Sequence, residues 1–286
     1  MNNENIFYHY CSLDTFQKII EGKTIRLCNI TKMNDSTEGK DIEKYASKQI
    51  QILRDNGFTF IDNSTTYISC FSRKKDLLSQ WRAYGDDGFG VAIGFDFDEL
   101  GIPKLVLNQD DQLVIMNYLA YGEVVYNNSN KQDIIKTINI NVRERKVNSD
   151  GVPINAAQFT NLQSELLKCK PIYKDEYFSE EDEVRIIYSV KDASDIGSKP
   201  FNIYKTAPYK YKIEKGIEFY VSKNELIDYV KLNISEDGET LNSSLIKEIV
   251  LGPKSKMDKD DLVLKNFMKA NGLSNTLITK SEGSYR

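Results

Sequence analysis

Two carboxylates and a guanidinium recur at every second position of the segment that begins at Glu181. On a β-strand, residues two apart lie about 6.6 Å from each other on one face, so Glu181, Glu183 and Arg185 would share a face. Neighbouring carboxylates raise each other's pKa, whereas a guanidinium favours the ionised form. Such opposed effects suit a site that stabilises a cation or moves a proton. The alternative is an exposed sheet edge that is protected by charge.

The only histidine, His9, stands between Tyr8 and Tyr10, in a segment whose aromatic, alternating pattern predicts a strand from Asn5 to Cys11. A lone histidine among aromatic residues is most often a core residue bonded to a carbonyl, and ligand binding is the alternative. A nucleophile pair of Cys11 and His9 is disfavoured, because side chains two apart on a strand do not reach hydrogen-bond distance unaided.

Trp81, the only tryptophan, lies three residues before Tyr84 in a segment with helical spacing, so the two rings occupy one patch of a helix. Core packing is the usual role of such rings. If this helix lies beside the strand of Glu181, one ring could instead form a wall of a nucleotide pocket. These aromatic clusters favour the functional interpretation of the carboxylate segment.

Composition narrows the class of protein. The chain has 286 residues, 40% of them apolar, and a formal net charge of −4. We expect a soluble globular protein without the basic field that draws proteins to nucleic acid or anionic lipid. No stretch reaches the roughly 18 apolar residues of a membrane span, and the N-terminal segment lacks the features of a signal peptide. A cytoplasmic protein with no membrane partner is expected.

The sequence lacks the common motifs of metal and nucleotide sites. The four cysteines form no C-x-x-C pair and there is one histidine, which disfavours a disulfide framework, a zinc knuckle and a multi-histidine centre. Only an all-oxygen Mg, Mn or Ca site is left open, and no metal ligand is assigned. The glycine-rich run from Gly85 to Gly90 precedes a strand and lacks the G-x-G-x-x-G spacing; P-loop, zincin and α/β-hydrolase motifs are absent.

Strand and helix patterns alternate irregularly, without the βαβ rhythm of a doubly wound parallel sheet. We therefore predict an α+β fold with mixed, mainly antiparallel sheets and flanking helices. The chain is predicted to be one domain over 1–286, with a helical insertion at about 128–172 that Pro171 ends. Further strands are expected at Thr24–Leu27, Thr65–Ser72, Phe89–Phe95, Val124–Tyr126, Glu183–Val190, Phe201–Tyr204, Ile217–Val221, Ile246–Leu251 and Thr276–Thr279. Helices are expected after Ser12, after Asp35, at Asp76–Tyr84 and at Asp258–Ala270, with a hairpin around Asn108-Gln109-Asp110-Asp111.

The order of these clusters resembles the bacterial domain-of-unknown-function family 2971. Its members open with an aromatic H-Y or K-Y strand and continue with N-D-x-x-E, C-F-S, W-x-x-Y, G-F and E-x-E-x-R. The matching residues are His9-Tyr10, Asn34-Asp35 with Glu38, Cys70-Phe71-Ser72, Trp81 with Tyr84, Gly94-Phe95, Glu181 to Arg185, Ile249-Val250-Leu251-Gly252-Pro253 and the closing Ser281 to Arg286. The resemblance spans nearly the whole chain. Phe178 departs from it, because the family usually has tryptophan ahead of E-x-E.

The arrangement is similar, more distantly, to the ADP-ribosyltransferase fold, in which a split β core surrounds NAD. This similarity implies that His9 bonds a ribose hydroxyl, that Ser72 supports the pocket and that Tyr84 or Trp81 stacks on nicotinamide. Tyr10 and Arg185 would then belong to the same NAD-binding set.

The same similarity implies that Glu183 is the catalytic carboxylate. Breaking the nicotinamide–ribose bond develops an oxocarbenium cation, and a preorganised carboxylate stabilises that charge. Glu181 would deprotonate or orient the acceptor, which could be a protein, a nucleic acid or water. The implied function is an NAD-dependent ADP-ribosyltransferase or NAD glycohydrolase with NAD as its substrate, for which a toxin or defence effector is one setting.

Two other functions stay open. One is a non-catalytic sensor or partner-binding module on the same fold, since a fold does not determine an activity. The other is a metal-dependent nuclease that would use Glu180, Glu181 and Glu183 as ligands.

Overall fold

The computed structural model describes residues 5–33, 46–55, 59, 64–105, 107, 118–127, 129–136, 156–191, 194, 196, 212–222, 224–235 and 240–285. Several predictions lie outside these residues. They are the cluster of Asn34, Asp35 and Glu38, the hairpin around Asn108-Gln109-Asp110-Asp111 and the strand Phe201–Tyr204.

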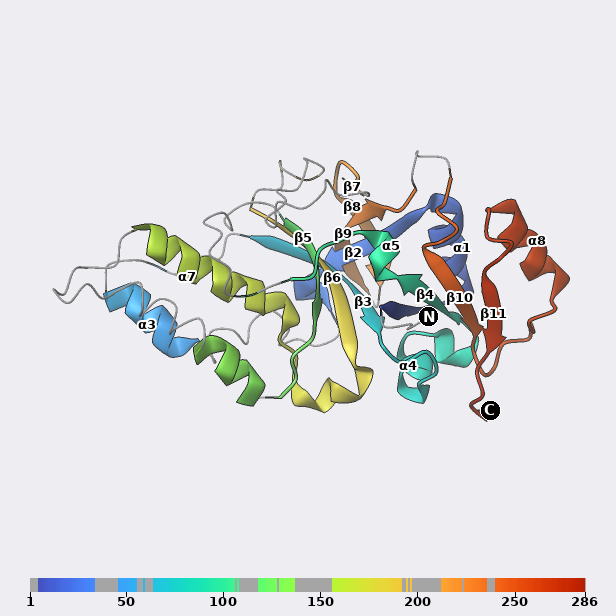
Figure 1. The fold of residues 1–286 in the computed structure, drawn as a ribbon, viewed down its shortest axis with the longest axis horizontal. Coiled ribbons are helices and arrows are strands. Elements are labelled where there is room, and N and C mark those ends of the chain that lie inside the picture. Colours follow the sequence, from blue (N-terminus) through green and yellow to red (C-terminus); the bar gives the residue numbers. More distant parts are fainter. Residues whose placement is uncertain are drawn as a thin grey trace.

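Eleven strands of the described residues form one large sheet (Figure 1). Among them, only β10 and β11 pair in parallel, and every other ladder is antiparallel. With the helices that accompany the sheet, this confirms the predicted α+β class. The strands are β1 (Ile6–Cys11), β2 (Thr24–Asn29), β3 (Thr65–Ser72), β4 (Val91–Asp96), β5 (Tyr118–Glu123), β6 (Glu183–Val190), β7 (Lys212–Ile213), β8 (Glu218–Ser222), β9 (Glu225–Asn233), β10 (Ile246–Leu251) and β11 (Leu277–Lys280).

Strand β3 is the branch point of the sheet. One of its edges pairs along its whole length with β6. Its other edge is shared by two strands: β1 pairs with it only at Tyr8 opposite Ser72, and β2 pairs with it at Cys28 opposite Ile68 and at the next residue. Between these contacts, residues 69–71 of β3 have no ladder partner on that edge among the described strands. The sheet therefore has an opening at the point along β3 where its partner on this edge changes from β1 to β2.

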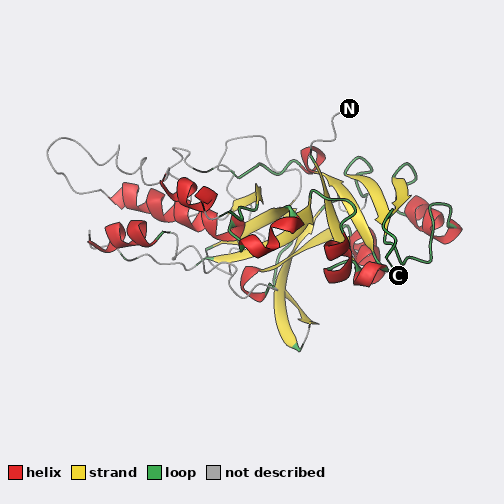
Figure 2. Cartoon of the chain, turned by 90° about the horizontal axis from the view of Figure 1, so that it is seen from below, coloured by secondary structure: helices red, strands yellow, loops and turns green. Residues whose placement is uncertain are grey.

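The longer helices lie toward the two ends of the sheet (Figure 2), and shorter ones such as α5 lie along it. The helix that connects β1 and β2 begins where the sequence predicts it, because the Ser12 side chain accepts a hydrogen bond from the Thr15 amide. The helices are α1 (Leu13–Gly22), α3 (Ser47–Asp55), α4 (Leu78–Ala83), α5 (Phe97–Leu100), α7 (Ala156–Cys169) and α8 (Leu262–Ala270), with the 3-10 turns η1 (Ile30–Lys32), η2 (Asp86–Gly88), η3 (Lys170–Ile172) and η4 (Glu176–Glu181). A further helix covers 129–136.

Three apolar clusters hold the described elements together, and the smallest joins Trp81 of α4 to Tyr10 of β1. The largest joins the sheet to α1 and α8 through buried residues such as Phe16, Ile20 and Met268. The second joins α7 and η3 to β5 and β6 through Leu166 and Ile172. Each fully buried side chain of this size stabilises the fold by about 1.5–3 kcal/mol relative to an exposed one. The two larger clusters fix the strands that surround the opening.

Some elements differ from the prediction. The strand expected at Val124–Tyr126 lies earlier, at β5, and Val125 forms only an isolated bridge with Tyr173. Strand β9, which joins β2 to β7 and β8, was not predicted. Within the described ranges, no helix has the length and apolar character that crossing a bilayer would require.

Candidate functional site

A cleft of about 620 Å³ lies at the opening between β1, β2 and β3. This volume falls within the roughly 300–1,000 Å³ of typical small-molecule sites. Residues of α1, β8, β9 and the segment from Lys174 to Glu183 complete its walls. Five predicted site residues line it, namely His9, Tyr10, Tyr84, Glu181 and Glu183.

His9 bridges the two strands at the opening. Its Nδ1 lies 2.9 Å from the carbonyl oxygen of Cys70, so a neutral imidazole that donates this bond keeps Nε2 as an acceptor. Its ring packs on Phe71 with centroids 5.4 Å apart. Loss of hydration lowers the pKa of His9, against the opposing effect of the bond to Cys70. His9 is therefore neutral at pH 7.

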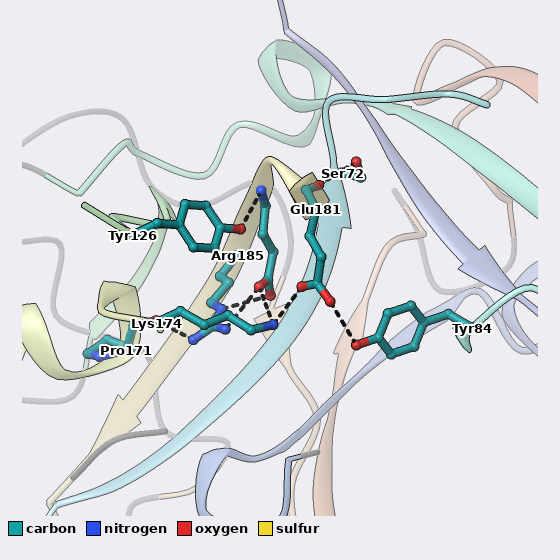
Figure 3. A network of polar contacts seen from close by, with 8 residues as sticks. Ser72, Tyr84, Tyr126, Pro171, Lys174, Glu181 and Arg185 are labelled. Atoms are coloured by element: carbon teal, nitrogen blue, oxygen red, sulfur yellow. Dashed lines mark hydrogen bonds and ion pairs between the residues drawn. The ribbon is translucent and has the colours of Figure 1, made fainter. Parts of the chain in front are cut away.

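Lys174 joins the two carboxylates of the site (Figure 3). Its Nζ lies 2.6 Å from Oε2 of Glu181 and 3.0 Å from Oε2 of Glu183. The Tyr84 hydroxyl donates to Oε1 of Glu181 at 3.3 Å. The ammonium also lies 4.8 Å from the centre of the Phe178 ring, within the range of a cation–π contact. One lysine thus holds two acidic side chains from different elements against each other.

Glu183 also forms a bidentate ion pair with Arg185. Nε of Arg185 lies 2.8 Å from Oε1 of Glu183, and Nη2 lies 3.0 Å from Oε2. The remaining nitrogen, Nη1, donates to the Pro171 carbonyl at 2.8 Å. Arg185 is 0% exposed, so its charge depends on these partners. All residues of β6 are buried and the strand pairs on both edges, with β3 and β5, so the alternative of an exposed sheet edge is wrong.

The two carboxylates differ in pKa. Burial raises the pKa of Glu181, against the opposing effect of Lys174 and the Tyr84 hydroxyl. Burial also acts on Glu183, but Arg185 and Lys174 outweigh it and lower the pKa of Glu183 to about 2. Glu183 is therefore a permanent anion, whereas Glu181 is the carboxylate better able to take up a proton. Neighbouring acids with separated pKa values are typical of acid–base sites.

A residue in the left-handed conformation separates the two glutamates. Asp182 has φ 45° and ψ 57° and ends η4, so Glu181 belongs to a helical turn while Glu183 begins β6. The Ser72 hydroxyl donates to the Glu181 carbonyl at 2.7 Å, and the Glu183 amide donates to the Tyr126 hydroxyl at 3.0 Å. The prediction that Glu181 lies on the strand is wrong, although both carboxylates line the same cleft.

Three predicted site residues lie outside the lining of the cleft. Trp81 is 1% exposed, and its Nε1 donates to Oδ1 of Asp76 at 2.7 Å. Arg185 is enclosed by its ion pair, and Ser72 supports the backbone of Glu181. Since none of the three is among the described residues that line the cleft, the tryptophan ring is not placed to stack on a ligand there.

Strand β2 contributes a guanidinium to the cleft lining, between two tyrosine rings. The Cζ atom of Arg26 lies 4.8 Å from the centre of the Tyr229 ring and 5.6 Å from that of Tyr220. Lys231 stands directly opposite Arg26 across β2 and β9 and forms an ion pair of 2.6 Å with Glu218. This cluster of Arg26, Glu218 and Lys231 is a second polar region of the cleft. Its residues come from other parts of the sequence than Glu181 and Glu183.

Sequence analysis missed both cations that stand out here. Lys174 follows the end of the predicted helical insertion in a segment without periodicity, so no pattern marks it. Arg26 stands in a predicted strand whose alternation of polar and apolar residues could have placed it on the polar face. Its neighbours could not be predicted, because they come from β8 and the unpredicted strand β9.

The acidic residues are not arranged as a metal site. Among the described residues, no group of three or more His, Cys, Asp and Glu side chains is placed to hold a metal ion. Glu180 is exposed, and the carboxylates of Glu181 and Glu183 both accept hydrogen bonds from Lys174. The donor set that a metal-dependent nuclease would need is not assembled in this part of the chain.

Comparisons with known proteins bear on one segment. No curated protein and no solved structure matched the chain. A family match begins in α4 and ends in β6, and it includes Tyr84, Glu181 and Glu183 but not His9. It covers less than half of the chain and is shorter than the nearly full-length resemblance expected from the order of the clusters. Residues 80–186 match the family described as Protein of unknown function (DUF2971).

Proposed function

We propose that the chain binds a nicotinamide dinucleotide in this cleft and cleaves its nicotinamide–ribose bond. The observation that carries the proposal is the convergence of His9, Tyr84, Glu181 and Glu183 on one cleft from separate parts of the chain. The cleft has the size of a small-molecule site, and its acidic pair has separated pKa values.

The chemistry assigns different roles to the two glutamates. The electrons of the glycosidic bond leave with nicotinamide, which departs as a neutral molecule, and C1′ of the ribose becomes cationic. A fixed carboxylate stabilises this charge. Glu181 suits this role better than Glu183, because its side chain is 13% rather than 4% exposed and it has no guanidinium partner. The resemblance implied Glu183 for this role; the proposal moves it to Glu181, which keeps its implied role toward the acceptor as well.

Glu183 then acts as a positioning residue for Lys174, and Lys174 in turn orients the carboxylate of Glu181. Water or another acceptor adds to C1′, and its proton passes to the Glu181 carboxylate. With water as the acceptor, the products are ADP-ribose, nicotinamide and one proton.

Two further side chains would hold the substrate. The neutral imidazole of His9 offers Nε2 as an acceptor for a ribose hydroxyl, since Nδ1 is directed at the Cys70 carbonyl. The Tyr84 ring lines the cleft and its hydroxyl bonds Glu181, which would place nicotinamide next to the carboxylate. Orientation of this kind is a large part of enzymatic rate enhancement.

The test is release of nicotinamide from NAD by the purified protein. We expect Glu181→Gln to lower kcat by about 10²- to 10³-fold, as for removal of one group that stabilises transition-state charge. The matched control is Glu180→Gln, because this neighbour is exposed. Failure of the parent protein to bind NAD or release nicotinamide would refute the proposal, as would a Glu181→Gln variant with parental kcat.

A binding module without catalysis is the second candidate, and one observation favours it. Lys174 and Arg185 supply two positive charges to the two negative charges of Glu181 and Glu183, so the network is already neutral. Such a network could serve only to fix the shape of the cleft. Nucleotide binding without release of nicotinamide, unchanged in Lys174→Met, would support this alternative.

A further inference from the structure

The region of the cleft around Arg26 has no part in the bond cleavage proposed above. Arg26 and Cys28 both line the cleft from β2, and Cys28 pairs with Ile68 on β3. If this ladder continued, Arg26 would stand opposite Cys70, whose carbonyl binds His9. The ladder ends two residues earlier, at Cys28 opposite Ile68. Arg26 and His9 therefore lie on opposite walls of the same opening.

The guanidinium of Arg26 is flanked by two rings, and no carboxylate of the described residues lies within ion-pair distance of it. The faces of Tyr220 and Tyr229 flank it at 5.6 and 4.8 Å, and the residue is only half-buried. In the described part of the chain it forms no hydrogen bond and no ion pair. A guanidinium has five N–H donors in one plane, so a ring contact leaves these donors available at the edge.

The carboxylates near Arg26 are engaged by other groups. Lys231 and Tyr229 lower the pKa of Glu218 through hydrogen bonds, and Arg26 adds to this only from beyond ion-pair distance. Lys231 stands directly opposite Arg26, and like charges directly opposite each other destabilise a sheet. Glu218 forms an ion pair with Lys231 at 2.6 Å and accepts a hydrogen bond from the Tyr229 hydroxyl at 2.7 Å. Glu214 also lines the cleft, but its carboxylate accepts from the Asn233 amide. Neither glutamate forms an ion pair with Arg26 among the described contacts.

A second polar group at the opening lacks a partner. Ser69 lies on the unpaired edge of β3, lines the cleft and is 4% exposed. Its Oγ has no hydrogen-bond partner among the described residues. Because buried polar groups in folded proteins are nearly always bonded, this hydroxyl points independently to a polar ligand in the cleft.

We propose that Arg26, flanked by Tyr220 and Tyr229, is an anion-binding subsite that takes a phosphate group of the bound nucleotide. A guanidinium matches two phosphate oxygens with two parallel hydrogen bonds, and its planar shape also stacks on aromatic faces. The identity of the ligand as a dinucleotide rests on the proposed function. The preference for a phosphate rests on Arg26 and its surroundings alone.

The experiment measures binding of ADP, adenosine and inorganic phosphate by calorimetry to the full chain. We expect Arg26→Ala to weaken ADP binding about tenfold to hundredfold and to leave adenosine binding unchanged. Arg26→Lys should fall between the parent and Arg26→Ala, because an ammonium keeps the charge without the planar fork. The matched control is Arg82→Ala, since Arg82 also lies over a tyrosine ring, at 6.0 Å from Tyr285, but is exposed and outside the lining of the cleft.

Each outcome decides the inference separately from the proposed function. Equal weakening of ADP and adenosine in Arg26→Ala would overturn it, because a stacking role would then explain the loss. Failure of the parent to bind ADP or phosphate would also overturn it. Binding of ADP through Arg26 without release of nicotinamide from NAD would support the subsite and reject the catalytic proposal. Release of nicotinamide from NAD with a KM that Arg26→Ala leaves unchanged would support the catalytic proposal and reject the subsite. Circular dichroism verifies that each variant folds. If Arg26→Ala does not fold, weaker ADP binding by Arg26→Lys than by the parent is the test of the subsite.

Discussion

Glu183→Gln is expected to lower the free energy of unfolding by about 3–5 kcal/mol, as for other buried ion pairs that lose one partner. Arg185 is 0% exposed and donates to both carboxylate oxygens of Glu183. Glutamine keeps the shape but offers one acceptor oxygen and turns an NH₂ group toward a cation. Of these three contacts, the bond to the Pro171 carbonyl and one bond to the amide oxygen then remain. Whole domains have a free energy of unfolding of about 5–15 kcal/mol, so the substitution would remove a large fraction of the stability.

The assay is urea unfolding at pH 7, followed by circular dichroism, with Glu180→Gln as the exposed neighbouring control. Removing both charges, as in Glu183→Leu with Arg185→Met, should recover much of the loss. The pH dependence has a defined sign: the pKa of Glu183 is lowered from 4.5 to about 2, so its stabilising effect is complete above pH 4.5 and disappears as the pH falls toward 2. A Glu183→Gln variant within about 0.5 kcal/mol of the parent would show that this carboxylate is not the counter-ion of Arg185.

Three further predictions concern single side chains. The imidazole of His9 should titrate below pH 6.5 in an NMR titration, because burial lowers its pKa, and its contribution to stability should fall as the pH drops below 6.5; a midpoint at or above 6.5 would contradict this. Iodoacetamide at pH 8 should leave Cys11 and Cys169 unmodified, because both are buried and burial raises the pKa of both thiols, that of Cys169 to about 12; peptide mapping should find the half-buried Cys28 and Cys70, which line the cleft, modified first and protected by a bound nucleotide. Gly90→Ala should lower the stability by at least about 1–3 kcal/mol, because a Cβ atom there would overlap the Cys11 carbonyl oxygen; an unchanged melting temperature would refute the close approach.

Local signals in the sequence predicted most elements within a few residues. The strand that contains His9, the helix capped by Ser12 and the strand Glu183–Val190 all follow from side-chain periodicity and capping. Periodicity did not reveal that Asp182 interrupts the carboxylate segment, because the interruption depends on a partner far away. The amide of Arg73 donates to the Asp182 carbonyl at 3.0 Å, which fixes the left-handed turn from another part of the chain.

The candidate site was less predictable than the fold, because its lining depends on how strands pair. Sequence patterns identified His9 and both glutamates as polar residues with unusual neighbours. They could not show that the two strands around α1 use different stretches of one edge of β3. For the same reason, the enclosure of Trp81 and the meeting of Arg26 with Tyr229 were outside the reach of local patterns.

The divided pairing of β3 has a mechanical consequence. In the sheet, β1 pairs with β4, which pairs with β10, whereas β2 pairs with β9. Each wall of the opening therefore belongs to a different half of the sheet. Helix α1 is the short connection between the two halves, and its Phe16 and Ile20 side chains are anchored in the main core. A rotation of one half about β3 would change the width of the gap while most ladder hydrogen bonds stay intact. Repacking beneath α1, which also supplies part of the cleft wall, is thus a way to tune ligand affinity.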